Sequence, residues 1–168
     1  MITPEYCRVM ARYNAWQNQN IRTAVERLTP DEFAQERGVF FGSLRRTLNH
    51  LLWGDLTWMS RFDGGPGPGC GSAEGLELTP TVAAWWAERF KLDGRITLWA
   101  ENLSSLDLVG ELTWFSGLLG AEVHRPVGLC VTHFFNHQTH HRGQVHAMLT
   151  GAGQDTADTD LFLMPGAV

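Results

Sequence analysis

Two histidines one helical turn apart are the clearest chemical signal in this sequence. His137 and His141 occupy positions i and i+4 of the string HFFNHQTHHRGQVHAML. On an α-helix this spacing rotates one residue by about 40° from the other, so both imidazoles lie on one face. Imidazole nitrogens bind divalent cations such as zinc at about 2.0–2.1 Å. The pair therefore indicates two ligands of a metal ion, and a third must come from elsewhere in the chain.

The best candidate for the third ligand is His50, which lies in the apolar string LNHLLWGD. A helix around it must pack its apolar face inward, where a neutral imidazole has few partners. The alternative interpretations are a hydrogen-bonded core histidine at His50 and a coincidental H-x-x-x-H pair at the other two positions. We predict a site of three neutral nitrogen ligands, His50, His137 and His141, from two neighbouring helices.

The other histidines of this region are weaker candidates. His133 lies about 40° from His137 on the other side from His141, where it is either a fourth ligand or an outer group. His140 is expected at the rim of the site or against a neighbouring helix. His146, about 180° away, is expected to face solvent or a partner subunit.

Three protein ligands leave a coordination position open, which is typical of catalytic metal sites. The ion can lower the pKa of a bound water to about 7, or deprotonate a bound thiol, and the same ligands serve both reactions. A zincin protease is excluded, because H-E-x-x-H needs a glutamate where this chain has Gln138. Asp55 lies about 140° around the helix from His50 and should miss the metal. No general acid or base is therefore assigned.

Several residues could support the site from neighbouring positions. Asn14 and Asn18, one turn apart, are expected to cap a neighbouring helix or to hydrogen-bond a ligand histidine. Trp53 is the best-placed tryptophan for lining an apolar pocket. Gln144 lies near the metal-binding face of its helix, whereas Arg142 points away and is expected to stabilise the helix or an interface.

Four segments carry the apolar periodicity of helices that would position these groups. They run from Pro4 to about Leu28, from a Ser43 cap to about Phe62, from Thr79-Pro80 to Leu103, and from about Pro126 to Gly151. Between the last two, GELTWFSGLLGAEVHRP has β-prone pieces around residues 117–120 and predicts a short hairpin. We expect one all-α domain over residues 1–168, a four-helix bundle with one long crossover that contains the hairpin.

Composition excludes several classes of protein. A net charge of −5 argues against a general nucleic-acid binder, which needs a basic face, and no apolar stretch approaches the ~20 residues of a membrane span. Three cysteines without a C-x-x-C pair favour a reducing compartment, and the N-terminus has no signal-peptide pattern, so we expect a cytoplasmic protein. The 11% aromatic and 18% charged residues predict a homodimer.

Several motifs together resemble the DinB/YfiT-like metalloenzyme superfamily over nearly the whole chain. Residues 13–18 resemble its Y-N-x-W-x-N helix, SLRRTLNHLLWGDLTWMSRF its second helix, FFNHQTHHRGQVHAML its N-H-x-x-x-H-R-G-Q helix, and DTDLFLM its tail. The resemblance places the family's ligands at His50, His137 and His141. It implies a four-helix bundle, commonly a dimer, that holds nickel, zinc or a similar ion. Some relatives resemble transferases or isomerases that use low-molecular-weight thiols.

The leading hypothesis is a cytoplasmic metal-dependent enzyme, either a hydrolase or a low-molecular-weight-thiol-dependent S-transferase, that acts on a small molecule. Nickel or zinc is the expected cofactor, and iron is a further option. The alternative is a non-catalytic dimeric bundle in which the ion only stabilises the fold. A third hypothesis is a dimerising interaction module whose histidines are incidental.

Overall fold

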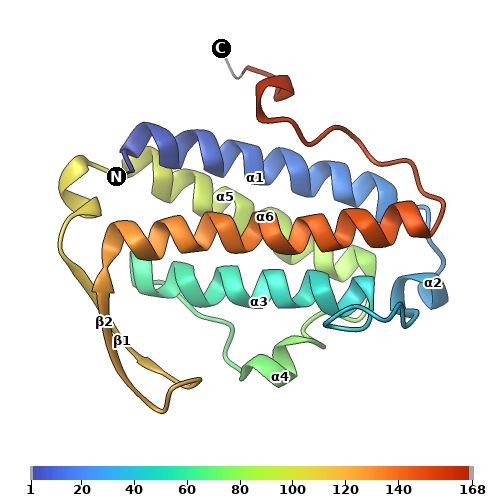
Figure 1. Cartoon of the computed structure of the whole chain (residues 1–168), viewed down its shortest axis with the longest axis horizontal. Coiled ribbons are helices and arrows are strands. Elements are labelled where there is room, and N and C mark those ends of the chain that lie inside the picture. The colour runs from blue at the N-terminus through green and yellow to red at the C-terminus, as the bar shows by residue number, and fades with distance from the viewer. Residues whose placement is uncertain (1, 167–168) are drawn as a thin grey trace.

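Four long helices form a bundle in the computed structural model, which describes residues 2–166 (Figure 1). They are α1 (Pro4–Val25), α3 (Leu44–Asp63), α5 (Val82–Asn102) and α6 (Val127–Gly151). Helices α1 and α3 each contact both α5 and α6, so the four close into a ring around one core. The prediction of a mostly helical four-helix bundle is confirmed.

Three of these helices begin at a hydroxyl side chain that accepts a hydrogen bond from the backbone N–H three residues on. The three capping residues are Thr3, Ser43 and Thr81. The predicted start of α5 at Thr79-Pro80 is two residues early, because Thr79 is buried and its hydroxyl donates to Oδ1 of Asn49 on α3. Thr79 therefore anchors the preceding loop to the bundle.

The connection between α3 and α5 runs along the bundle. Asp55 and Asp63 of α3 bind Arg89 and Arg95 of α5 in the same chain order, so these two helices are parallel. Parallel neighbours need a connection that returns along the bundle, and the Gly- and Pro-rich segment with the short helix α4 (Ser72–Gly75) supplies it (Figure 1). We predicted the crossover between α5 and α6. In the structure α5 ends and α6 begins at the same end of the bundle, so their connection does not run along it (Figure 1).

The predicted hairpin is present between α5 and α6. Strand β1 (Glu111–Ser116) pairs antiparallel with β2 (Ala121–Pro126), and residues 117–120 form the turn. The ribbon projects from the end of the bundle where α6 begins (Figure 1). Trp114 of β1 packs against Trp58 of α3, with 5.5 Å between ring centroids. The hairpin thus contacts the helix that carries His50.

Short helices complete the structure, and the sequence prediction did not include them. Helix α2 (Pro30–Ala34) follows α1 and has a capping box formed by Thr29 and Glu32. Besides α4, the others are the 3₁₀ helices η1 (Ser105–Leu108) and η2 (Leu161–Leu163). The T-P-x-E string at residues 29–32 is the sequence pattern of a capping box and would have predicted the start of α2. The segment after α2 leads the chain to α3 and brings Phe41 against His50.

Apolar side chains from all four long helices fill the bundle interior. Fully buried examples are Val25, Leu52, Ile96 and Phe134. No helix in residues 2–166 is long and apolar enough to cross a membrane.

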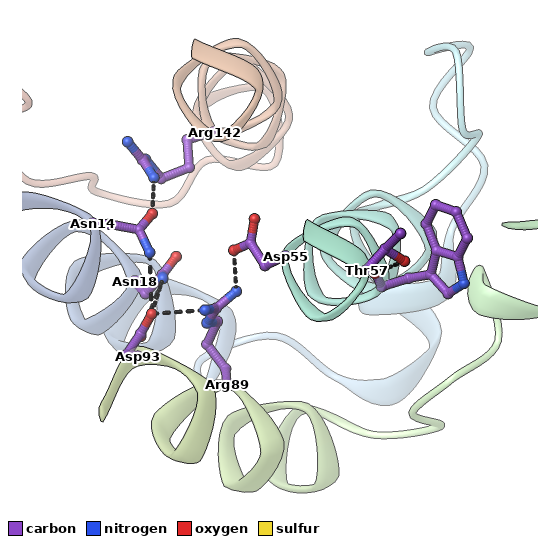
Figure 2. A network of polar contacts seen from close by, with 8 residues as sticks. Asn14, Asn18, Asp55, Thr57, Arg89, Asp93 and Arg142 are labelled. Atoms are coloured by element: carbon purple, nitrogen blue, oxygen red, sulfur yellow. Dashed lines mark hydrogen bonds and ion pairs between the residues drawn. The ribbon is translucent and has the colours of Figure 1, made fainter. Parts of the chain in front are cut away.

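A buried ion-pair network also crosses this interior (Figure 2). Arg89 of α5 donates to Asp55 of α3 at 2.6 Å and pairs with Asp93 at 2.8 Å. Burial raises the pKa of both carboxyl groups, and the charge of Arg89 opposes that rise. Asp55 thus faces the core, as its predicted offset from His50 implies.

Two asparagines of α1 extend this network toward α6. Asn14 and Asn18 donate to Asp93 at 3.1 and 3.0 Å, and Arg142 of α6 donates to the oxygen of Asn14 (Figure 2). The expectation that these asparagines cap a helix or bind a ligand histidine is therefore wrong. Arg142 is buried and joins α6 to α1. The partner of each group depends on helix packing that the sequence pattern does not specify.

Candidate metal centre

The structure brings His50, His137 and His141 together between α3 and α6. Each ring offers one nitrogen, and these three atoms all lie within 4.8 Å of one another. Nε2 of His50 is 3.0 Å from Nε2 of His137. Two nitrogens bound to one ion at about 2.0–2.1 Å and near-tetrahedral or octahedral angles are themselves about 3 Å apart. The three side chains are therefore close enough to hold one metal ion.

Gln144 orients the third imidazole. Nδ1–H of His141 donates to Oε1 of Gln144 at 2.7 Å, which leaves Nε2 of His141 with its lone pair free. Metal-binding histidines usually donate their second ring N–H to such a partner, which fixes the tautomer and the ring orientation. The sequence placed Gln144 near this face but did not identify its role, although the i, i+3 spacing from His141 was a readable signal.

Aromatic rings cover one side of His50. The Phe41 ring stacks on His50 with 4.1 Å between centroids and lies 5.4 Å from His141. Trp53 lies farther away, 6.4 Å from His50, and its Nε1–H donates to the carbonyl of Cys70 at 3.0 Å. Phe41 thus limits water access to His50, while Trp53 ties the glycine-rich connection to α3. Sequence reasoning missed Phe41 because it lies in an irregular loop, where spacing carries no information about contacts.

Gly54 makes room for the ring of His137. It is one turn after His50 on α3, and a Cβ built on Gly54 would stand 3.1 Å from Cε1 of His137. A contact that short forces the imidazole to shift by a few tenths of an ångström. Sequence reasoning missed this role of Gly54 too, because a glycine inside a helix indicates only low helix propensity.

The substitution Gly54→Ala should therefore lower metal affinity while leaving the helix intact. Alanine gains up to about 1 kcal/mol of helix propensity over glycine, so thermal unfolding should change little or rise. The displaced His137 ring should weaken zinc binding by about two- to fivefold, because a shift of a few tenths of an ångström takes up much of the ~0.5 Å within which a ligand group stays in productive geometry. Isothermal titration with zinc and a melting curve of the metal-free protein measure the two effects separately. Unchanged zinc affinity would show that His137 needs no such space.

All three imidazoles are neutral at pH 7. Burial, with the neighbouring imidazoles, lowers the pKa of His50 to about 4 and that of His137 to about 3. Burial also lowers the pKa of His141, although the hydrogen bond to Gln144 opposes it. No acidic side chain within residues 2–166 is among the groups that shift these three pKa values. A divalent ion held here would keep most of its charge for a further ligand.

These pKa values predict that metal binding persists well below pH 6.5. A proton competes with the ion only where it can bind the metal-free imidazole, and for His50 that occurs near pH 4. Because the pKa of all three histidines is lowered, zinc occupancy, measured by equilibrium dialysis in a non-chelating buffer, should stay nearly constant as the pH falls from 7 through 6.5. It should fall as the pH approaches 4. Half-release near pH 6.5, the ordinary pKa of histidine, would contradict the prediction.

The remaining histidines of α6 lie outside the trio. His133 is 5.7 Å from His137 between ring centroids and also contacts Trp58, which is an outer position. His140 is exposed beside His141 at the rim, as expected. His146 is partly buried, and its Nε2 hydrogen-bonds the Thr156 hydroxyl at 3.0 Å. The expectation that His146 faces solvent or a partner is wrong, because the C-terminal segment packs back on it.

Comparison with known proteins identifies the family. The model of the DinB family matches residues 1–166. The chain belongs to the DinB family. A curated DinB relative, Protein DinB of Bacillus subtilis (strain 168), is 30% identical over 156 residues, which cover 90% of this chain and 88% of that protein. The resemblance seen in the sequence motifs is confirmed, and the reaction of this DinB-family chain has to be argued from its own residues.

Proposed function

We propose that this DinB-family protein binds one divalent metal ion through His50, His137 and His141 and is a metal-dependent enzyme acting on a small molecule. The observation that carries the proposal is the convergence of three neutral imidazoles within 4.8 Å. Three protein ligands leave at least one position for a further ligand. Nickel or zinc is the proposed ion, with iron as a further candidate, because imidazole suits all three.

When bound, the ion would act as a Lewis acid that lowers the pKa of a water or a thiol, which suits a hydrolase or a low-molecular-weight-thiol-dependent S-transferase. The residues around the site orient the ligand imidazoles and shield them from water. Gln144 holds His141 in the tautomer that presents Nε2. Phe41 covers one face of His50 and excludes water there. His140 is exposed at the rim, with its ring centroid 4.7 Å from that of His141.

Elemental analysis and turnover together test the proposal. Protein purified without an affinity tag should contain about one divalent ion per chain, and zinc or nickel added to stripped protein should raise Tm. The loaded form should then turn over thiol-conjugation or simple hydrolase substrates that the stripped form does not. A protein that contains no metal and gains no thermal stability from added metal would contradict the proposal.

A structural ion in a non-catalytic bundle is the alternative, and His141→Ala separates the two functions. In an enzyme the variant should stay folded and lose turnover, because the core does not depend on the ion. In a structural site the variant should lose the thermal stability that the metal confers on the wild type. His146→Ala is the matched control, since His146 lies on the other face of α6 and contacts Thr156.

We also propose that the protein is a cytoplasmic homodimer. Large apolar side chains are exposed at the hairpin turn and in η1, where Leu118 is 95% and Leu106 83% exposed. Exposed apolar surface of this kind is typical of contacts between subunits. The three cysteines are free, which fits a reducing compartment. Light scattering at micromolar concentration should give the mass of a dimer, and a monomer would contradict the proposal.

A further inference from the structure

A hollow of about 460 Å³ opens between α3, α5 and β1, at the end of α3 remote from the metal centre. Its volume falls within the range of about 300–1,000 Å³ that is usual for small-molecule sites. The eleven residue steps from His50 to Arg61 span about 16 Å of helix, so the two sites are separate. The apolar wall of the hollow consists of Phe62, Leu98, Trp99, Leu103, Leu112 and Val127.

Most charged groups of this hollow already have partners. Arg95 donates from Nε and Nη2 to the two carboxylate oxygens of Asp63, at 2.8 and 2.6 Å. Asp107 accepts from the backbone N–H and the hydroxyl of Ser104 at 2.8 and 2.7 Å, and it is exposed to solvent, which screens its charge. Neither carboxylate is engaged by Arg61.

Arg61 is the exception among the charged residues of the hollow. Its guanidinium carbon lies 4.6 Å from the ring centroid of Trp58 and 5.0 Å from that of Trp114. Within residues 2–166 it makes no hydrogen bond or ion pair; burial lowers its pKa, and the nearby thiol of Cys130 opposes that shift. The two indole faces compensate part of the desolvation of the charge. The N–H donors of Arg61 are left for an anion.

We propose that this hollow binds an apolar small molecule bearing one carboxylate, with Arg61 as the residue that recognises the anion. The apolar wall accommodates the hydrocarbon part, and the planar guanidinium matches the two oxygens of a carboxylate. Trp58 and Trp114 already restrict the arginine side chain, so little conformational entropy is lost on binding. The single unpaired cation beside an apolar wall selects a free organic anion over a neutral or cationic ligand of the same shape.

Three ligands of equal chain length test this selection: octanoate, 1-octanol and octylammonium. Isothermal titration should show octanoate binding at least tenfold more tightly than octanol, with octylammonium the weakest. Octanoate should also shift the NMR signals of the Leu98 and Leu112 methyl groups and of the Trp99 indole N–H. The result should be the same in stripped and metal-loaded protein, so failure of the metal proposal would leave this test intact.

Substitutions test whether the preference for octanoate over octanol depends on Arg61. Arg61→Gln should remove the preference for octanoate over octanol, and Arg61→Lys, which keeps the charge, should retain part of it. Arg22→Gln is the matched control, because Arg22 also stacks on an indole, at 4.8 Å from Trp86, but lies outside the hollow. It should leave the preference unchanged.

A second variant tests the hollow without changing Arg61, so the proposal can still be tested if Arg61→Gln does not fold. Leu98 is 61% exposed, so Leu98→Glu should fold normally, place a carboxylate in the hollow and reduce octanoate binding at least tenfold. Equal affinities for octanoate and octanol in the wild type would overturn the proposal, as would an unchanged preference in Arg61→Gln. Occupation of the hollow by a second copy of the chain, seen as a dimer whose interface includes the Leu98 and Leu112 methyl groups and prevents octanoate from binding, would overturn it too.

Discussion

Replacing His137 with alanine should weaken zinc or nickel binding more than a hundredfold. The three imidazole rings are nearly equidistant, with centroids 5.0 Å apart for His50 and His137, 4.5 Å for His137 and His141, and 4.6 Å for His50 and His141, so His137 is a full member of the set. Loss of a hydrogen-bonded partner outside the ligand set commonly costs 10–100-fold in metal affinity, so loss of a ligand should cost more. Competition with a chelator of known affinity, on untagged protein, measures the change.

The metal-free variant should remain folded. Nδ1 of His137 is buried and has no hydrogen-bond partner within residues 2–166, so alanine removes an unsatisfied polar atom along with the ring. We therefore expect the melting temperature of the stripped variant to stay close to that of the stripped wild type. His133→Ala is a control on the same helix, one turn away, and should retain metal. An affinity within tenfold of wild type for His137→Ala would refute the three-histidine site.

Local spacing explains why the three histidines that lie close together could be chosen from the sequence. The positions of His137 and His141 relative to each other depend only on the geometry of one helix. His50 could be chosen because few other histidines lie on an apolar helix. The long helices were predictable for the same reason, since their apolar periodicity and caps are local features. The hairpin was readable from β-prone strings on both sides of a glycine-rich turn.

The parts of the site that could not be predicted depend on how one helix packs on another. Phe41 reaches His50 from a loop, and Gly54 matters only because the His137 ring of α6 approaches it. Asn14 and Asn18 were expected near the ligands, but they bind Asp93 of α5, because α1 packs against α5 over its length. Polar residues on a helix have several chemically suitable partners, and only the tertiary arrangement selects one.

Replacing Arg89 with methionine should be among the most destabilising single changes in the chain. Arg89 and Asp55 are both almost fully buried and are joined at 2.6 Å, and Asp93 pairs with the same guanidinium (Figure 2). Removing one partner of a buried ion pair typically costs about 3–5 kcal/mol, because a charge is left in the core without compensation. Urea unfolding followed by circular dichroism should show this loss. Lys91→Met, in the exposed pair with Glu88, should stay within about 1 kcal/mol of wild type.

The pH dependence of Arg89→Met identifies the cause of its instability. Burial raises the pKa of Asp55 and Asp93 above the value in the unfolded chain, and loss of the guanidinium should raise both further. A carboxyl group with a raised pKa in the folded state favours folding when protonated, and this contribution is lost as the pH rises through the folded pKa. The difference in the free energy of unfolding between variant and wild type should therefore become smaller as the pH falls from 7 toward 5. A gap that does not change with pH would assign the loss to packing around the methionine, because only the unpaired carboxylates couple the defect to protons.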